Sequence, residues 1–170
     1  NARDVELVGI QFKHSRWNDP STNDGFLERY GTVHYLRCDS EAGLATGQCF
    51  NGSEACAAGC CGAEAIDGCA LAMARAAVRV NAATNITIRN CSFRHLGGWG
   101  IGLTGATSHA AVQRKVFTEL SAGAVYVGNV NETRSWMSQP FHNEVTDNII
   151  ANVGVEYQVS QCLVPLTHRL

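Results

Sequence analysis

The sequence lacks any hydrophobic run long enough to cross a membrane as a helix, because no apolar stretch approaches the roughly 18 residues that a spanning helix needs. It also lacks an excess of either charge. The 13 Lys and Arg residues nearly balance the 15 Asp and Glu residues, for a net charge of −2. This balance gives no electrostatic basis for binding nucleic acid or an anionic membrane. We therefore expect neither a membrane span nor a nucleic-acid partner.

An amphipathic helical pattern is missing too, since no apolar stripe at helical spacing persists for three turns. Apolar residues instead occur as short alternating pairs: Ile86 and Ile88, Ile101 and Leu103, Val125 and Val127. This two-residue period is typical of strands, and Gly and Asn separate the pairs. The regularly spaced Leu residues of a leucine-rich repeat are absent as well. The pattern predicts an all-β protein built from short strands.

The stretch from 78 to 128 contains two copies of one repeat unit. Aligning Phe93 with Phe117, 24 positions later, brings the flanking apolar residues into register. The matched pairs are Ile88 with Val112, Leu96 with Leu120, Ile101 with Val125 and Leu103 with Val127. Less complete copies place Phe12 and Ile150 at the aligned position, and Val78 to Val80 form the tail of an earlier unit. Such self-similarity, combined with short strands, predicts a right-handed parallel β-helix.

We interpret residues 1–170 as a single β-helix domain with two interruptions. The coils occupy about 1–37 and 71–170, a Cys-rich loop is inserted at 38–70, and a second loop bulges out at 129–141. The chain begins without Met and stops within a pattern. Because open β-helix ends expose strand edges, we expect a fragment with open ends that joins further coils of the same full-length chain.

The inserted segment 38–70 has little apolar periodicity and needs another source of stability. It holds six of the eight cysteines: Cys38, Cys49, Cys56, Cys60, Cys61 and Cys69. We predict disulfides, with a zinc knot and free thiols as alternatives; the segment has no CxxC pair and no His, which disfavours zinc. Disulfides in turn imply an oxidising compartment, so we expect a secreted or extracellular protein.

Four Asn-x-Ser/Thr triplets fit that compartment, at Asn51, Asn85, Asn90 and Asn131. Asn85 and Asn90 lie within the repeat, where Asn also suits a left-handed turn or a side-chain ladder. Asn51 and Asn131 lie in the insertions and are the better candidates for glycosylation.

The segment 85–98 reads Asn-Ile-Thr-Ile-Arg-Asn-Cys-Ser-Phe-Arg-His-Leu-Gly-Gly and resembles a coil of right-handed β-helix repeat proteins of the pectate-lyase-like superfamily. The segments 120–128 and 143–157 are similar to further coils of that group. The resemblance covers most of the chain outside 38–70 and implies kinship with polysaccharide lyases and glycoside hydrolases. The pectate-lyase Arg-x-Pro-x-x-Arg signature is missing, as is the polygalacturonase set of paired Asp plus Gly-His-Gly. Neither mechanism carries over to this chain.

In a β-helix, equivalent positions of neighbouring coils lie about 4.8 Å apart, so the alignment predicts columns of side chains. Two positions after the aligned Phe stand His14, His95, Glu119 and Asn152. Six positions after it stand Trp99, Gly123 and Glu156, and three positions before it stand Asn90, Arg114 and Asp147.

The Trp99–Gly123–Glu156 column predicts a notch in which a sugar stacks on Trp99 opposite a carboxylate. Carboxylates about one rung apart suit a retaining glycosidase, and about two rungs an inverting one. The candidate catalytic residues are Glu156, Glu119 and His95, and the candidate substrate-binding residues are Trp99, Tyr157, Arg114 and Tyr126. In the alternative interpretation Trp99 caps a turn, Glu156 binds backbone N–H groups, His95 is a stacked turn residue and Arg114 pairs with Asp147.

Two functional classes remain open. The first is a secreted carbohydrate-active protein, a glycoside hydrolase-like enzyme rather than a polysaccharide lyase, acting on a glycan bound along the β-helix face. The second is a non-catalytic glycan-binding or structural surface module. We expect no cofactor. We also expect no metal, because Asp19, Asp24 and Glu28 do not match an EF-hand, and the His109–His142 column lacks a third ligand.

Overall fold

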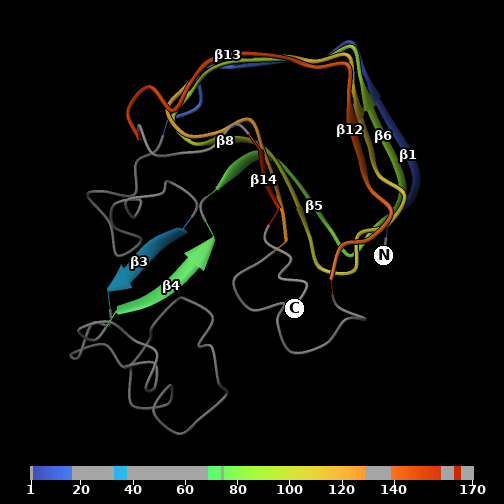
Figure 1. Cartoon of the computed structure of the whole chain (residues 1–170), viewed down its shortest axis with the longest axis horizontal. Coiled ribbons are helices and arrows are strands. Elements are labelled where there is room, and N and C mark those ends of the chain that lie inside the picture. Colours follow the sequence, from blue (N-terminus) through green and yellow to red (C-terminus); the bar gives the residue numbers. More distant parts are fainter. Residues whose placement is uncertain are drawn as a thin grey trace, which may run out of the picture.

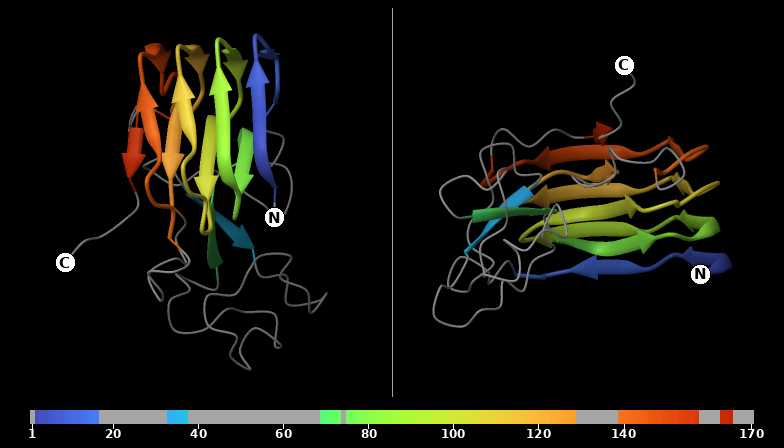
Figure 2. Two further views of the ribbon diagram at one scale, coloured as in Figure 1. Left: turned by 90° about the vertical axis from the view of Figure 1, so that its right-hand side faces the viewer. Right: turned by 90° about the horizontal axis from the view of Figure 1, so that it is seen from below.

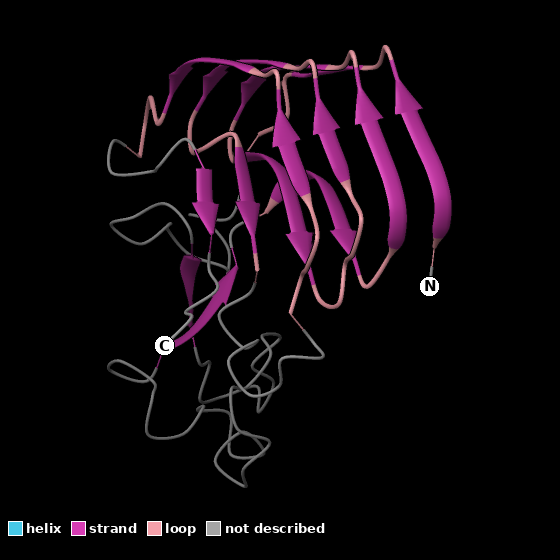
Figure 3. Ribbon diagram, turned by 45° about the vertical axis from the view of Figure 1, so that its right-hand side comes forward, coloured by secondary structure: helices cyan, strands magenta, loops and turns pink. Residues whose placement is uncertain are grey.

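The computed structural model describes residues 2–16, 33–37, 69–73, 75–128, 139–157 and 163–165. These residues form strands, turns and loops without any helix (Figure 3). Accordingly, no helix with the length and hydropathy to cross a bilayer occurs in the described part of the chain. The all-β class predicted from the alternating pairs is confirmed.

Twelve of the strands form three parallel sheets of four strands each. The first sheet contains β1 (Arg3–Val8), β6 (Thr84–Arg89), β9 (Ala111–Gln113) and β12 (Glu144–Thr146). The second contains β2 (Gln11–Lys13), β7 (Ser92–Leu96), β10 (Val116–Leu120) and β13 (Ile149–Val153). The third contains β5 (Ala76–Asn81), β8 (Trp99–Thr104), β11 (Val125–Val127) and β14 (Leu163–Pro165).

The chain visits these sheets in turn and then returns to the first. We call one passage through the first, second and third sheets a coil. The four coils are β1–β2–β5, β6–β7–β8, β9–β10–β11 and β12–β13–β14, and Figure 2 shows their strands side by side in sequence order. Viewed along the stack, equivalent strands nearly overlap (Figure 1). This arrangement is compatible with a parallel β-helix.

The strand pairing confirms the register predicted from the repeat. Phe117 pairs with Phe93 on one side and with Ile150 on the other, and Phe12 pairs with Phe93. The rings of Phe12 and Phe93 stack with centroids 4.7 Å apart, and those of Phe93 and Phe117 with centroids 5.0 Å apart. Val78 pairs with Ile101, so the predicted tail of an earlier unit is indeed the third-sheet strand of the first coil.

The core lies inside the coils and is built from one alternate set of strand residues. Its fully buried members include Ile88, Val112, Phe93, Phe117, Leu120, Ile101 and Leu103. Because alternate strand residues face opposite sides, the intervening polar residues point outward. Burying each of these large side chains contributes about 1.5–3 kcal/mol, which explains why the apolar pairs fix the register.

Each corner of a coil is turned by a residue with positive φ, at the same position in successive coils. The first corner, between the first and second sheets, contains Gly9, Asn90, Arg114 and Asp147. The second corner, between the second and third sheets, contains His14, His95, Glu119 and Asn152. The third corner, where each coil enters the first sheet, contains Asp4 and Asn85, the second residues of β1 and β6, and His109 and His142, just before β9 and β12. Asn85, Asn90 and His95 all have the positive φ that suits a turn residue, although Asn85 lies within β6 and His95 within β7.

Two further features mark the N-terminal region. Gly9 turns the chain with φ 69°, so β1 and β2 are separate strands. Strand β3 (Val33–Arg37), within the predicted coil region 1–37, pairs antiparallel with β4 (Cys69–Met73) and lies outside the three parallel sheets.

Candidate functional site

The second corner gathers most of the ionisable residues predicted to carry chemistry. His14, His95 and Glu119 occupy its left-handed position on three successive coils, with φ of 59°, 51° and 55°. Because a left-handed residue turns its side chain away from the apolar interior at a corner, these groups are exposed. The column predicted two positions after the aligned Phe is thus formed in the structure.

The three side chains contact each other along the stack. The imidazole rings of His14 and His95 are parallel, with centroids 5.1 Å apart and an interplanar angle of 3°. His95 Nδ1 lies 2.6 Å from Glu119 Oε2, and both side chains are half exposed. A carboxylate cannot donate a hydrogen bond, so Nδ1 carries the proton. The neutral ring then has an unprotonated Nε2, which is a base directed away from Glu119.

Glu156 and Tyr157 reach the same corner from the last coil. Their backbone N–H groups both donate to the carbonyl oxygen of Ser121, at 3.3 Å and 3.0 Å. Ser121 follows Glu119 by two residues, so Glu156 and Glu119 border the second corner on neighbouring coils. The predicted alignment of Glu156 with Gly123 was wrong, because the bend at residues 154–157 shifts the pairing to Ser121.

Three of the predicted substrate-binding aromatic residues form one cluster. Trp99 and Tyr126 meet edge to face with centroids 5.4 Å apart, and Tyr157 packs against them. Trp99 is 0% exposed and Tyr126 is 1% exposed. The expectation that they offer an open surface to a sugar was therefore wrong, since their rings are covered on all sides. They form a packed cluster beside the corner instead.

This cluster lies on the outer side of the third sheet. Ile101 and Leu103 point into the core, so Gly102 between them faces outward, and Tyr126 is its partner in the register. A Cβ atom at Gly102 would lie 2.7 Å from Tyr126 Cε2. Only glycine leaves room for the tyrosine ring at this position. Burial raises the pKa of the Tyr126 phenol to about 12.

Tyr157 is the partly exposed member of the cluster. Burial first, and the neighbouring Glu156 carboxylate second, raise the pKa of its phenol above the ordinary value. Both causes disfavour the phenolate. Tyr157 is therefore a hydrogen-bond donor at neutral pH, adjacent to the Glu156 carboxylate.

Arg114 does not join the other candidate residues. It turns the first corner, five residues before Glu119 at the second corner, which corresponds to roughly 15 Å of extended chain. Arg114 precedes β10 and Glu119 lies near its end, so the substrate-binding candidate Arg114 is not brought together with the catalytic candidate Glu119. Arg114 and Asp147 share the corner position, yet their described side chains form no ion pair.

The third corner contains the other histidine pair. His109 and His142 contact each other at 70° with ring centroids 5.3 Å apart, and Phe141 packs against both. Asn85 Nδ2 donates to Asp4 Oδ1 at 2.6 Å. Among the described residues, no group of three or more His, Cys, Asp or Glu side chains is arranged to hold a metal ion.

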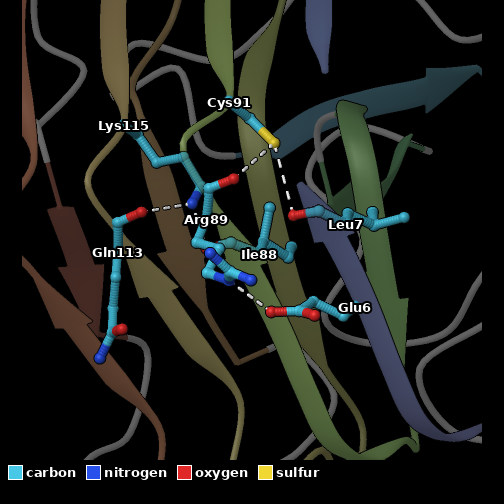
Figure 4. A network of polar contacts seen from close by, with 7 residues as sticks. All are labelled: Glu6, Leu7, Ile88, Arg89, Cys91, Gln113 and Lys115. Carbon is cyan, nitrogen blue, oxygen red and sulfur yellow. Dashed lines mark hydrogen bonds and ion pairs between the residues drawn. The ribbon is translucent and has the colours of Figure 1, made fainter. Parts of the chain in front are cut away.

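A polar ladder on the inner side of the first corner was not predicted, and Figure 4 shows its members Cys91 and Lys115. One side chain in each of three coils donates to a main-chain carbonyl of the preceding coil. The bonds join Cys91 Sγ to Leu7 O at 3.6 Å, Lys115 Nζ to Ile88 O, and Asn148 Nδ2 to Val112 O at 2.9 Å. The 24-residue offset between Cys91 and Lys115 could have predicted that the two side chains occupy equivalent positions. Because lysine is rarely buried, nothing in the sequence indicated that Lys115 lies inside the coils.

Several predicted features fall outside the described side chains. These are Cys38, Cys49, Cys56, Cys60, Cys61 and Cys69, the glycosylation candidates Asn51 and Asn131, and most of the loop 129–141. Cys91, which was not among the disulfide candidates, is a buried free thiol. Comparison with known proteins found no matching family model, no matching curated protein and no matching solved structure.

Proposed function

We propose that the chain is a right-handed parallel β-helix of the pectate-lyase-like type. Three four-stranded parallel sheets visited in rotation, and a register that repeats Phe on Phe, support this proposal. The left-handed residue at every corner is a further feature expected of stacked coils. The resemblance of the segment 85–98 to such a coil points to the same family.

We further propose that the protein is a secreted, carbohydrate-active, glycoside hydrolase-like enzyme whose glycan lies across the second corner. The observation that carries this proposal is the His95–Glu119 pair, with Glu156 at the same corner on the next coil. Glycoside hydrolysis needs one group that donates a proton and one that activates water or attacks the sugar. Two acidic side chains and an imidazole facing solvent can supply both functions.

The buried aromatic cluster changes how a sugar would be held. Trp99 and Tyr126 provide a rigid wall under the corner rather than a stacking surface. Contacts to the sugar hydroxyls would come from the exposed column of His14, His95, Glu119 and Asn152, together with the Tyr157 phenol. Such a site favours a ligand that lies along the coils, because the column runs in that direction.

The test is incubation of the protein with a panel of neutral and acidic polysaccharides, followed by detection of released reducing ends. Glu119→Gln and Glu156→Gln each remove a charge while keeping the side-chain shape. We expect each to lower the rate by about 100-fold or more. Glu6→Gln is the matched control, because Glu6 is an exposed carboxylate on the first sheet that pairs with Arg89 away from the corner. Equal activity of all three variants would refute the assignment.

The second candidate is a non-catalytic glycan-binding or structural module. The observation that favours it is the complete burial of Trp99 and Tyr126, which leaves Tyr157 as the one partly exposed member of the described aromatic cluster. In that case a polysaccharide would bind without being cleaved. Calorimetric titration with the same panel, run beside the reducing-end assay, distinguishes the two. The module predicts that the native protein, Glu119→Gln and Glu156→Gln all bind a polysaccharide and that none of them releases reducing ends.

A further inference from the structure

The roles of His95 and Glu119 within the candidate site are set by the direction of the bond between them. His95 Nδ1 faces Glu119 Oε2 at 2.6 Å, so the proton of the neutral imidazole lies on Nδ1. A solvated histidine favours the opposite tautomer, with the proton on Nε2. The carboxylate therefore selects the ring form whose free lone pair is on Nε2. No described group forms a hydrogen bond with that nitrogen, and half of the side chain is exposed.

The orientation of the ring is set from the other side. His14 stacks on His95 at 5.1 Å with an angle of only 3° between the planes. Both residues turn the same corner with nearly equal φ, so their backbones hold the rings parallel. Asn152, at the equivalent position beyond Glu119, shows that this corner also accepts a short amide side chain.

We propose that His95 Nε2 is the proton-accepting group of the candidate site, with Glu119 and His14 as positioning residues. The inference rests on the proposed function and deepens it. In the proton-transfer step, the Nε2 lone pair takes a proton from a water or a sugar hydroxyl. The electron pair of the broken O–H bond stays on oxygen, which becomes the nucleophile. The imidazolium keeps its Nδ1–H bond to Glu119, whose negative charge stabilises it.

This assignment gives Glu119 and Glu156 different chemical roles. Glu119 is occupied by the imidazole and does not itself exchange protons with the substrate. Glu156, whose described contacts are made by its main chain, acts in its protonated form: it gives its proton to the leaving oxygen as the bond from that oxygen to the anomeric carbon breaks and the activated oxygen bonds to the same carbon. His95 and Glu119 then act as one unit, so removing both costs no more than removing His95 alone.

The first experiment measures the tautomer and needs no activity. Long-range proton–nitrogen correlation spectra of the 15N-labelled full chain, recorded where the imidazoles are neutral, report which nitrogen of His95 carries the proton. We expect Nδ1–H in the native protein and a return to Nε2–H in Glu119→Asn, a variant that the corner accommodates as it does Asn152. His109, at the third corner without a described carboxylate contact, is the internal control. A His95 ring with its proton on Nε2 in the native protein would overturn the inference.

The second experiment uses whichever glycan the panel identifies. We expect His95→Asn, Glu119→Asn and the double variant to lose rate by similar factors of about 100-fold or more, with unchanged KM. His14→Phe keeps a flat stacking ring but loses the polar contact to the sugar, so it should raise KM and leave kcat nearly the same, whereas His14→Asn should lower kcat as well. A double variant much slower than either single variant would show that His95 and Glu119 act independently, which would contradict the inference. If no glycan is cleaved, the proposed function fails, while the tautomer result still decides the geometry of the pair.

Discussion

Lys115 donates a hydrogen bond from its side-chain nitrogen to the main-chain carbonyl oxygen of Ile88 in the preceding coil. The same nitrogen donates to the carbonyl oxygen of Gln113 at 2.6 Å, and the lysine is 1% exposed. No carboxylate pairs with Lys115 among the described residues. A buried lysine satisfied only by carbonyl dipoles is a costly group, because desolvation disfavours its charge.

The first prediction concerns the pH dependence that this lysine imposes on stability. Burial lowers the pKa of Lys115 from 10.5 to about 8, with the Cys91 thiol opposing the shift and Arg89 reinforcing it. The unfolded chain therefore binds more protons than the folded one between pH 8 and 10.5. The free energy of unfolding should rise with pH in this window, by up to about 1.4 kcal/mol per pH unit. Below pH 8 the full cost of burying the charged amine is present.

Urea unfolding of the native protein and of Lys115→Asn at pH 7, 8, 9 and 10 checks this prediction. Asn is the matched replacement, because Asn148 makes the equivalent bond in the next coil. Only the difference between the two proteins is interpreted, since other groups titrate in both. A difference that stays constant from pH 7 to pH 10 would show that Lys115 keeps an ordinary pKa in the fold.

The second prediction concerns Tyr126, which responds to alkaline pH with the opposite sign. Burial raises the pKa of its phenol to about 12, with Arg79 opposing the shift. Because the folded pKa lies above the unfolded value of 10.0, the stabilising contribution is complete below pH 10 and is lost as the pH rises toward 12. At pH 11 we expect only about a tenth of the full phenolate absorbance from Tyr126 in the folded protein. The difference spectrum between the native protein and Tyr126→Phe should therefore grow several-fold on unfolding in urea at this pH.

Much of the fold could be predicted because each coil repeats the same positions and contacts only the neighbouring coils. Phe93 and Phe117 meet for the same reason that they align in the sequence, since each coil adds one rung to a stack. Corner residues were predictable in part, because Asn90 is a residue type that tolerates positive φ. Arg114 and Glu119 at the same kind of position were not, since neither residue type signals a left-handed turn.

The candidate site was harder to predict because corners are where the register changes. The equal spacing of the repeat placed Glu156 beside Gly123, but the bend after β13 pairs it with Ser121. The burial of Trp99 could not be predicted either. The two-residue period of a strand predicts which side of the sheet a side chain lies on, but not which other residues cover that side. The repeat predicted that His95 and Glu119 share a column. It could not predict which imidazole nitrogen faces the carboxylate, because that depends on the side-chain conformation.

The third prediction tests the packing of Tyr126 on the outer face of the third sheet. Gly102→Ala places a methyl group against the buried ring, which has no free space to move into. We expect a loss of about 1–3 kcal/mol in the free energy of unfolding. In a Tyr126→Ala background the same substitution should cost less than about 0.5 kcal/mol, because the obstructing ring is gone. Equal costs in both backgrounds would mean that the alanine methyl group clashes with something other than Tyr126.

The fourth prediction tests whether the role of Arg114 depends on its backbone geometry or on a contact of its side chain. Its φ is 54°, its side chain is exposed, and its described contacts are made by the main chain alone. A left-handed backbone costs a non-glycine residue about 1–2 kcal/mol, and a β-branched residue is the least tolerant. Arg114→Gly should therefore keep or raise the free energy of unfolding, whereas Arg114→Ile should lower it by about 1 kcal/mol or more. Glycan binding should be unchanged in Arg114→Gly, because the first corner lies away from Glu119. If Arg114→Gly instead lost binding while keeping its stability, the ligand would have to extend across the second sheet from one corner to the other.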